Sequence, residues 1–580
     1  MARVKWKNQQ TGEKAQFIAE TLNEALFNYS FDSNKAPTLN THFFCEDYLA
    51  TYAMVNEAIM QEGNMVPLNE EFEHIVTNSI WMPACVSPSV LNFRNKQGFF
   101  FNIKDDKNCK NIETAKRSEY YKDSANYICQ LLSSDQDYSS LILKEINNIL
   151  LSSTFTLEEK TVLYFCVREY VSELINLGYS KTHLYMQVQN KLFKYRTSKD
   201  DVKYIIKFLS SLQSSEEKYS VIFGISDKAY SEFEGLINCV REAAENEKAS
   251  LSANYVVDTD KIRASDPVSA LESAKKMMST FIDIYNAGIH DCNMRIFDNG
   301  LVKAEEGENY VLINDSINLL TKNPIKAKEE RQKWIKVAVQ RNITPSVVAA
   351  FDLHNNALQI CEPSTQLLSL WTIIEVIIET KQNFMSRSNY ITNILCDILC
   401  STYFHRCISA LHAQITHFPG IKAIIDSEPR GNDTVEKLAL ILKDNTALQA
   451  SLIAKLKKYP LEAYKIEHFS NLFGSKERMA SNIIRHSNRL RWQIMRIYRN
   501  RCMIVHNGSN FPYINSILEN LHFYIDELFD YILLKTDVGL KDLEAIFACA
   551  RIKQSETVSI LSDKKTTLSD DEYIDMIFKY

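Results

Sequence analysis

Residues that interrupt helices are scarce along this chain, which has only 14 glycines and 12 prolines among 580 residues. Both counts lie well below the average usage in globular proteins. Leucine, isoleucine, lysine and glutamate are abundant by contrast, and most of these residues favour helix. We therefore predict a mainly α-helical fold. The length is far above the size at which one hydrophobic core stops growing, so roughly two to four domains are expected.

Strand patterns are few and fall in the first part of the chain. Short runs of β-branched and aromatic residues predict strands at 98–103, 219–225, 254–258 and 309–315. Between these runs, apolar residues recur mostly at helical spacing. Residues 1–330 are therefore expected to form a helix-rich region, of one or two domains, that contains a small β-sheet. Residues 331–362, where the pattern weakens, are expected to connect this region to the rest.

The last third of the chain carries long amphipathic helix patterns with short or medium connections and no strand signal. The predicted helices cover 364–382, 388–418, 432–445, 446–459, 476–508 and 512–536. Such a series is typical of a helical bundle. We predict this bundle over residues 363–540, followed by a helical tail over residues 541–580.

The net charge and the cysteine pattern limit which ligands and which cellular compartment are expected. The net charge is −6, so any binding to nucleic acid has to use a local basic patch. The 13 cysteines are scattered singly and show no zinc-ligand spacing, which indicates a reduced cytoplasmic protein without a metal or other cofactor. The most apolar run, 367–378, is too short to cross a bilayer and contains a glutamate. A membrane partner is therefore not expected.

The predicted helix at 476–508 is rich in arginine. Seven arginines lie between positions 478 and 501. Arg485, Arg489, Arg496 and Arg499 are separated by four, seven and three residues, so they share one helix face. A face of this kind is ordinarily solvated or paired with acidic side chains. The alternative is a basic track along which RNA lies.

The end of this helix suggests a specific chemistry. In the stretch YRNRCMIVHNG, His506 follows Arg499 and Arg501 and precedes a predicted stop at Asn507-Gly508. An imidazole exchanges protons near neutral pH, and guanidinium groups present forked cations to phosphate oxygens. Because RNA carries its own nucleophile, the 2′-OH, these groups suffice for cleavage to a 2′,3′-cyclic phosphate without a metal. We therefore predict that His506 transfers protons and that Arg501 and Arg499 hold the scissile phosphate.

The same stretch resembles the motif of the HEPN superfamily, an arginine followed after four to six residues by a histidine. Arg501 and His506 match the form with four intervening residues, and Arg499 and His506 match the form with six. In the family, the residue after the arginine is commonly Asn, Asp or His. Arg501 is followed by Cys502, which departs from that pattern, and Arg499 is followed by Asn500, which fits it. Both arginines therefore remain candidates.

A second element carries the resemblance further. The run LLSLWTIIEVIIET resembles the first helix of the Apea-like HEPN group, with its Leu-Trp-x-x-x-Glu pattern at Leu370, Trp371 and Glu375. The resemblance covers about residues 363–540. It implies a metal-independent endoribonuclease whose domains pair, so that two motif helices build one composite site in a homodimer or higher homo-oligomer.

Several neighbouring residues are expected to support the site. Tyr498, Asn500 and Asn507 flank the motif and are predicted to contact the substrate or the catalytic side chains. Glu375 lies within a strongly apolar run, where a carboxylate needs a partner. It either forms an ordinary buried salt bridge or orients His506 or one of the arginines.

The resemblance also implies a biological setting, because many proteins of this group act as toxins or in bacterial immunity to phage. We expect a toxin-like effector of abortive infection that cleaves RNA, with residues 1–330 as its regulator and a phage-derived trigger as a partner of that region. The alternative is a bundle that binds RNA or protein without cleavage. A second Arg-to-His spacing, Arg406 to His412, and the adjacent residues 290–292 (HDC) are weaker candidates for a site.

Overall fold

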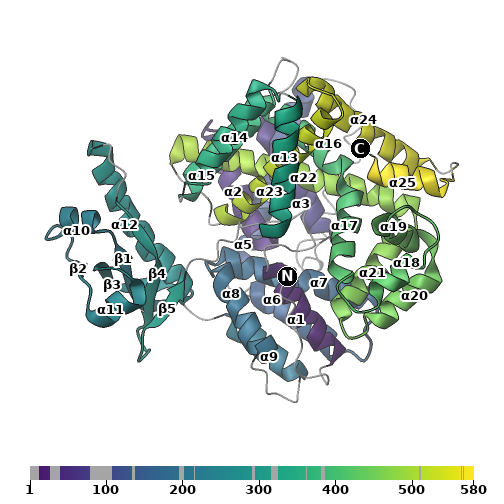
Figure 1. Cartoon of the computed structure of the whole chain (residues 1–580). Coiled ribbons are helices and arrows are strands. Elements are labelled where there is room, and N and C mark those ends of the chain that lie inside the picture. Colours follow the sequence, from purple (N-terminus) through teal and green to yellow (C-terminus); the bar gives the residue numbers. More distant parts are fainter. Residues whose placement is uncertain are drawn as a thin grey trace. The chain divides into compact units, whose positions relative to one another are not determined.

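The fold is mainly helical. The computed structural model describes residues 12–26, 39–78, 107–133, 138–194, 201–213, 216–289, 294–314, 324–341, 343–360, 362–379, 386–508, 511, 513–563, 565 and 567–579. These residues form 24 α-helices and one five-stranded antiparallel sheet (Figure 1). The predicted fold class, mainly α with a small sheet, is confirmed.

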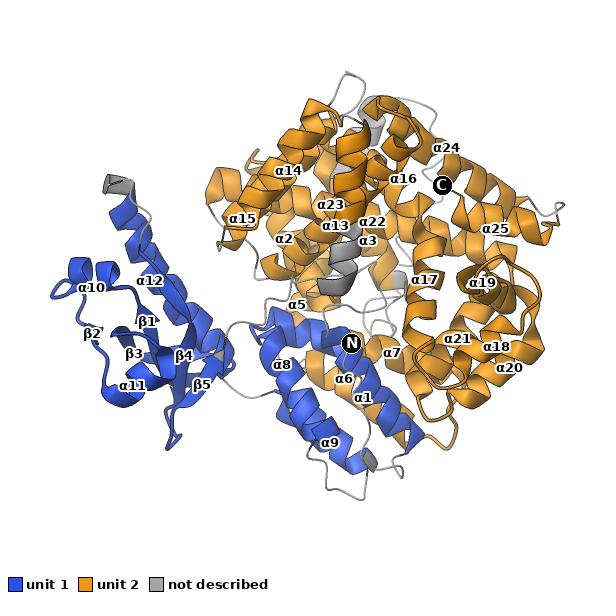
Figure 2. Ribbon diagram, viewed as in Figure 1, with its two compact units in different colours: residues 1–28, 170–321 blue, residues 29–169, 322–580 orange. Residues whose placement is uncertain are grey.

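The chain divides into two compact units, and each is built from two separate segments (Figure 2). Unit 1 comprises Met1–Asn28 and Tyr170–Thr321, and unit 2 comprises Tyr29–Glu169 and Lys322–Tyr580. Unit 2 therefore contains the predicted 363–540 bundle together with helices from the N-terminal part of the chain. Sequence neighbours within the first 330 residues are thus divided between the two units.

The sheet lies in unit 1. Its strands are β1 (Glu217–Ile225), β2 (Val240–Glu242), β3 (Tyr255–Ala264), β4 (Ile296–Ala304) and β5 (Val311–Asn314), in the order β2-β3-β1-β4-β5. The strands predicted at 219–225, 254–258 and 309–315 correspond to β1, β3 and β5. The run 98–103 lies outside the described residues. Strands β2 and β4 were not predicted, because β2 is only three residues long and β4 contains the turn-forming sequence Asp-Asn-Gly.

Helix α12 (Pro267–Ile289) packs on this sheet and explains the glycine in β4. Alternate residues of β1, among them Val221 and Phe223, are buried in one core with Leu271 of α12. A β-carbon at Gly300 would overlap the end of the Leu271 side chain, so any other residue there would require this leucine to shift. A residue that resembles a turn signal in the sequence thus lies where the α12 side chain Leu271 packs against the sheet.

Short helices complete unit 1. They are α1 (Glu13–Leu26), α8 (Lys181–Val188), the π-helix η2 (Gln189–Lys194), α9 (Asp201–Ser211), α10 (Asp227–Phe233) and α11 (Glu245–Leu251). Helix α1 packs against α8 and α9, and the Gln189 side chain donates a hydrogen bond to Asn23. The first helix of the chain is thereby tied to residues more than 150 positions later in the sequence.

Unit 2 is entirely helical in its described part. Its N-terminal elements are α2 (Thr41–Asn56), the 3₁₀-helix η1 (Glu62–Asn64), α3 (Met65–Asn78), α5 (Lys107–Ser133), α6 (Tyr138–Leu151) and most of α7 (Leu157–Asn176). The later elements are α13 (Pro324–Arg341), α14 (Pro345–Ala357), α15 (Pro363–Ile377), α16 (Arg387–Ser401), α17 (Tyr403–Ile415), α18 (Ile421–Asp426), α19 (Thr434–Asp444), α20 (Thr446–Lys455), α21 (Pro460–Phe473), α22 (Lys476–Asn507), α23 (Ile514–Asp537), α24 (Leu543–Ser562) and α25 (Asp570–Phe578). One core of buried apolar side chains runs from Phe44 and Phe72 of the N-terminal helices to Trp371 and Leu528 of the bundle.

The predicted helix at 388–418 is two helices, α16 and α17, which meet at Thr402 with a bend of 47°. The Ser401 and Thr402 hydroxyls both donate to the Ile398 carbonyl, at 2.8 and 3.5 Å. Such side-chain bonds compete with the helical backbone pattern and account for the break. Within the described ranges, no single helix has the length and apolar character to span a bilayer, and α16 with α17 passes that test only as this bent pair.

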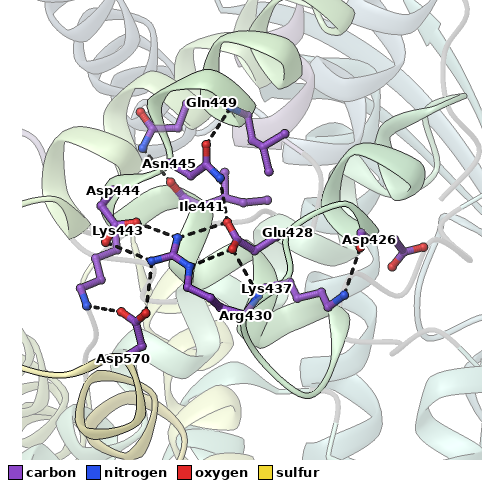
Figure 3. Close-up of polar contacts among 11 residues, drawn as sticks. Asp426, Glu428, Arg430, Lys437, Ile441, Lys443, Asp444, Asn445, Gln449 and Asp570 are labelled. Carbon is purple, nitrogen blue, oxygen red and sulfur yellow. Dashed lines mark hydrogen bonds and ion pairs between the residues drawn. The ribbon is translucent and has the colours of Figure 1, made fainter.

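A polar cluster fixes the turn before α19 to the C-terminal helix α25 (Figure 3). Glu428 is 1% exposed and accepts hydrogen bonds from Arg430 Nε at 2.8 Å and Asn445 Nδ2 at 2.9 Å. Arg430 also pairs with Asp444 at 2.8 Å and with Asp570 at 3.2 Å. One guanidinium therefore joins three carboxylates that come from three different parts of the chain.

This cluster predicts acid sensitivity. The hydrogen bond from Arg430 holds the pKa of Glu428 below its ordinary 4.5, and Lys443 lowers the pKa of Asp570 below 3.8. Lowered carboxyl pKa values stabilise the fold above the ordinary pKa, and this stabilisation is lost as pH falls through the lowered values.

We expect Arg430→Ala to lower the free energy of unfolding at pH 7 by about 1–3 kcal/mol, because a buried carboxylate loses its main donor. We also expect the variant to lose less stability than the wild type between pH 5 and pH 3 (roughly the carboxyl range). Urea denaturation followed by circular dichroism measures both effects. The exposed pair of Arg551 supplies the control, Arg551→Ala, which should change little. Equal acid profiles for wild type and Arg430→Ala would contradict the prediction.

Candidate functional site

The predicted motif lies on α22, a single helix of 32 residues. Ser475 caps its start by accepting a hydrogen bond from Arg478 N at 3.3 Å. Gly508 ends it with a left-handed φ of 63°, and its N–H donates to the Ile504 carbonyl. The sequence prediction of a helix over 476–508 therefore agrees with the structure. His506 lies in the last turn, two residues before that glycine.

Two of the arginines on the predicted basic face are fully buried. Arg499 is 0% exposed and donates through Nη2 to Asp47 Oδ2 at 2.9 Å. Arg496 is 1% exposed and contacts Asp47 through Nε at 3.4 Å and Glu71 through Nη2 at 2.5 Å. The Tyr513 hydroxyl donates to the other oxygen of Asp47 at 2.8 Å. These five side chains are called the Asp47 cluster below.

The carboxylates of the Asp47 cluster come from α2 and α3; α3 packs against α22, and α2 contacts it through Asp47 and through Met54, which packs with Cys502 and Met503. Burial, followed by the Asp47 charge, raises the pKa of Tyr513 well above its usual range, so this residue stays a hydrogen-bond donor. Nε and Nη1 of Arg499 are buried without a hydrogen-bond partner among the described residues. Asp47 is therefore the principal partner that offsets the desolvation of this guanidinium.

The part of α22 that precedes Arg496 is also partly covered by α3. Arg491 forms an ion pair with Glu70 of α3. Burial, with the charges of Arg489 and Arg485 adding to it, lowers the pKa of His74 on α3 to about 4. His74 is therefore neutral at pH 7, which avoids repulsion between α3 and α22. Arg485 is exposed and Arg489 is half-buried, so only this short part of the predicted track reaches solvent.

The C-terminal end of α22 is open. His506 and Asn507 are exposed and Arg501 is half-buried. On an ideal helix, five residues separate Arg501 from His506 by about 7.5 Å along the axis and about 140° around it. Asn500, predicted to support the site, is instead buried and donates to the Arg496 carbonyl at 3.0 Å. It does not share the exposed surface of His506.

The Leu-Trp-Glu helix, α15, meets α22 beside Arg501. The Trp371 indole donates to Glu375 at 2.9 Å, and its ring lies 5.6 Å from that of Tyr498. Burial raises the pKa of Tyr498 to about 12, and Cys502 is its hydrogen-bonding neighbour. Burial also raises the pKa of Cys502, an effect that Arg501 opposes and Glu375 strengthens. Glu375 and Arg501 thus both act on one thiol, and the α15 and α22 parts of the predicted site lie together.

Arg406, the arginine of the second Arg-to-His spacing, forms contacts within the helical bundle. Arg406 pairs with Glu527 at 2.7 Å and donates to the Leu399 carbonyl at 2.6 Å. Burial lowers the pKa of His412, which is half-buried. Arg406 therefore links α17 to α23. Residues 290–292 lie outside the described ranges.

The acidic residues that pair with Arg491, Arg496 and Arg499 were not predicted from the sequence. Asp47, Glu70 and Glu71 lie more than 400 positions before the arginines, and no motif connects them. One signal was present for Asp47, which interrupts the largely apolar run THFFCEDYLATYAM. A carboxylate on a buried helix face implies a buried cation, because an unpaired charge is costly to bury.

No family model, curated protein or solved structure matches this chain. In the part of the chain that the structure describes, no group of three or more His, Cys, Asp or Glu side chains is placed to hold a metal ion.

The Asp47 cluster predicts a large loss of stability on removal of its carboxylate. Asp47→Ala leaves two buried guanidinium groups with one carboxylate between them, so we expect the free energy of unfolding to fall by about 3–5 kcal/mol. Glu46, exposed on the same helix, provides the control Glu46→Ala, for which a change under about 0.5 kcal/mol is expected. Urea denaturation of both variants measures the difference. Similar stability for the two would show that the cluster is weakly coupled to folding.

Proposed function

We propose that the C-terminal end of α22 is the active site of a metal-independent endoribonuclease. The observation that carries the proposal is the exposed His506 imidazole in the last turn of the same helix as Arg501. No carboxylate among the described residues forms an ion pair with Arg501. A cation without a described ion-pair partner, at the same end of the helix as a solvent-accessible imidazole, suits a phosphodiester that needs both charge stabilisation and proton transfer.

The burial pattern favours one of the two candidate arginines. Arg499 is committed to Asp47 and enclosed, so it would have to leave a buried ion pair to contact RNA. Arg501 is half-buried, and its charge acts on the Cys502 thiol and the Tyr498 phenol. We therefore assign phosphate binding to Arg501 and the anchoring of α22 to Arg499 and Arg496. Asn507 remains a candidate for contact with RNA because it is exposed beside His506.

The proposed reaction uses the substrate's own hydroxyl. One imidazole accepts the proton of the 2′-OH, and the 2′-oxygen then bonds to phosphorus. The bond to the 5′-oxygen breaks, and that oxygen takes a proton as it leaves. The products are a 2′,3′-cyclic phosphate and a 5′-hydroxyl. Acceptance and donation in one step need two groups, so a second copy that brings its own His506 would complete the site.

This requirement for two acid–base groups supports a homodimer, or a higher homo-oligomer, as the active form. RNA is then the substrate, with Arg485 and Arg489 as the accessible part of the basic face. In this proposal the protein is a cytoplasmic toxin-like effector of abortive infection. Residues of the 1–330 region, to which a phage-derived trigger would bind, regulate it.

The catalytic claim is tested with purified protein, RNA and EDTA. We expect cleavage that leaves cyclic-phosphate ends, and we expect His506→Ala to reduce the rate by at least about 100-fold. His417 is also exposed on the bundle, so His417→Ala is the matched control and should cleave like wild type. A parallel assay follows growth of cells that express each protein, with and without phage challenge. RNA binding with equal residual cleavage in all three proteins would instead support the non-catalytic bundle.

The assignment of the arginines is tested separately. We expect Arg501→Ala to lower cleavage by at least about 100-fold with an unchanged unfolding midpoint, because this side chain is not part of the Asp47 cluster. Arg499→Ala should instead lower the free energy of unfolding by about 3 kcal/mol or more. Both quantities are measured on both variants. The reverse outcome, with Arg499→Ala stable and inactive, would assign phosphate binding to Arg499.

A further inference from the structure

Unit 1 contains a cavity of about 320 Å³ between α8, η2 and α9. This volume falls at the lower end of the range of small-molecule sites. Its lining includes Tyr179, His183, Lys191, Tyr204, Lys207 and Phe208. None of these residues belongs to the α22 site, which lies in unit 2.

The described side chains that line the cavity include basic residues but no acidic ones. Lys191 and Lys207 are both exposed and both line the cavity, whereas the lining contains no aspartate or glutamate. The chain as a whole has 72 acidic and 66 basic side chains, so a wall with two lysines and no carboxylate departs from the average. No ion pair of either lysine is found among the described residues. The cavity is therefore suited to an anion, which would supply the missing counter-charge.

Aromatic rings form another part of the wall. Tyr179 and Phe208 are buried, and Tyr204 is half-buried. The Tyr204 hydroxyl donates to the Lys191 carbonyl at 3.0 Å, which holds α9 against η2 across the cavity. Lys191 itself lies in the π-helix η2, a rare conformation that is frequent at functional sites. A ligand with both a planar apolar part and a negative charge matches this combination.

Two neutral polar groups also face the cavity. Burial lowers the pKa of His183, an effect that Asp266 opposes, so the ring is uncharged at pH 7. Its Nε2 lies 3.4 Å from Nε2 of Gln187, which is another lining residue. A neutral imidazole and an amide each offer a hydrogen-bond donor and an acceptor. Such groups suit the polar edge of a heterocycle better than a second phosphate.

We propose that this cavity binds a nucleoside phosphate, with the phosphate at Lys191 and Lys207 and the base among the aromatic rings and the His183–Gln187 pair. The proposal does not depend on RNA cleavage at α22. It predicts that charge and ring are both required, so inorganic phosphate and the uncharged nucleosides bind more weakly than the nucleotides.

The test is isothermal titration of the full-length chain with AMP, GMP, CMP and UMP, and with inorganic phosphate and the four nucleosides for comparison. We expect at least one nucleotide to bind, and we expect Lys191→Glu/Lys207→Glu to weaken it at least tenfold. Lys203→Glu, exposed on α9 but outside the lining, is the charge-matched control and should bind like wild type. Lys191→Gln/Lys207→Gln, which avoids charge reversal, should show an intermediate loss, and thermal unfolding verifies that each variant is folded.

Four outcomes would overturn the proposal. These are binding of none of the four nucleotides, equal binding by the double variants and wild type, equal affinity for inorganic phosphate, and equal affinity for the matching nucleoside. Because nucleotides resemble fragments of RNA, Arg501→Ala is titrated as well. Loss of binding in that variant, with retention in the lysine variants, would place the nucleotide at α22 instead.

Discussion

The Asp47 carboxylate is the interaction on which the arrangement of α22 depends. It is fully buried and accepts hydrogen bonds from two guanidinium groups and one phenol. Each of these groups is costly to bury alone, so the helices that carry them are stable together and unstable apart. The pairing also fixes the rotation of α22, because a shift by one residue would turn its arginines by about 100° away from α2.

This constraint divides α22 into two parts with different roles. Helices α2 and α3 cover its middle, and the arginines there form buried ion pairs with Asp47 and Glu71. The cover extends to Cys502 and Met503, which pack with Met54 of α2, whereas Arg501 is half-buried and His506, in the last turn, is exposed. The two motif arginines are two residues apart in sequence, yet only one keeps a guanidinium that a phosphate could neutralise. Burial separates two side chains that the spacing rule treats as equivalent.

Charge is distributed differently in the two units. In unit 2, buried carboxylates neutralise arginines around α22, and Arg430 joins three carboxylates near α25. In unit 1, the cavity between α8 and α9 leaves two lysines without a described acidic partner. Pairing inside a core favours a unique packing, whereas unpaired cations around an open cavity favour an external anion. The same side-chain chemistry thus supports folding in one place and suggests binding in the other.

The sequence by itself determined the helical character, three of the five strands, the extent of α22 and its glycine stop. These features depend on residues close together in the chain, where periodicity and capping act. The resemblance led us to expect that Glu375 either forms a buried salt bridge or orients His506 or an arginine; in the structure Glu375 accepts a hydrogen bond from Trp371. By contrast, β4 was not predicted because it contains the turn signal Asp-Asn-Gly, and Gly300 packs against Leu271 of a different element.

Only the tertiary structure decided which arginines of α22 are accessible to solvent and which are buried. Arg496 and Arg499 read as surface cations because helical spacing reports which residues share a face and carries no information on what covers that face. The cover comes from Asp47 and Glu71, more than 400 residues away, and their contacts are set by the packing of a common core. Exposure is a property of the folded chain. The local sequence pattern therefore could not show whether an arginine of α22 is accessible to a ligand or buried as a structural anchor.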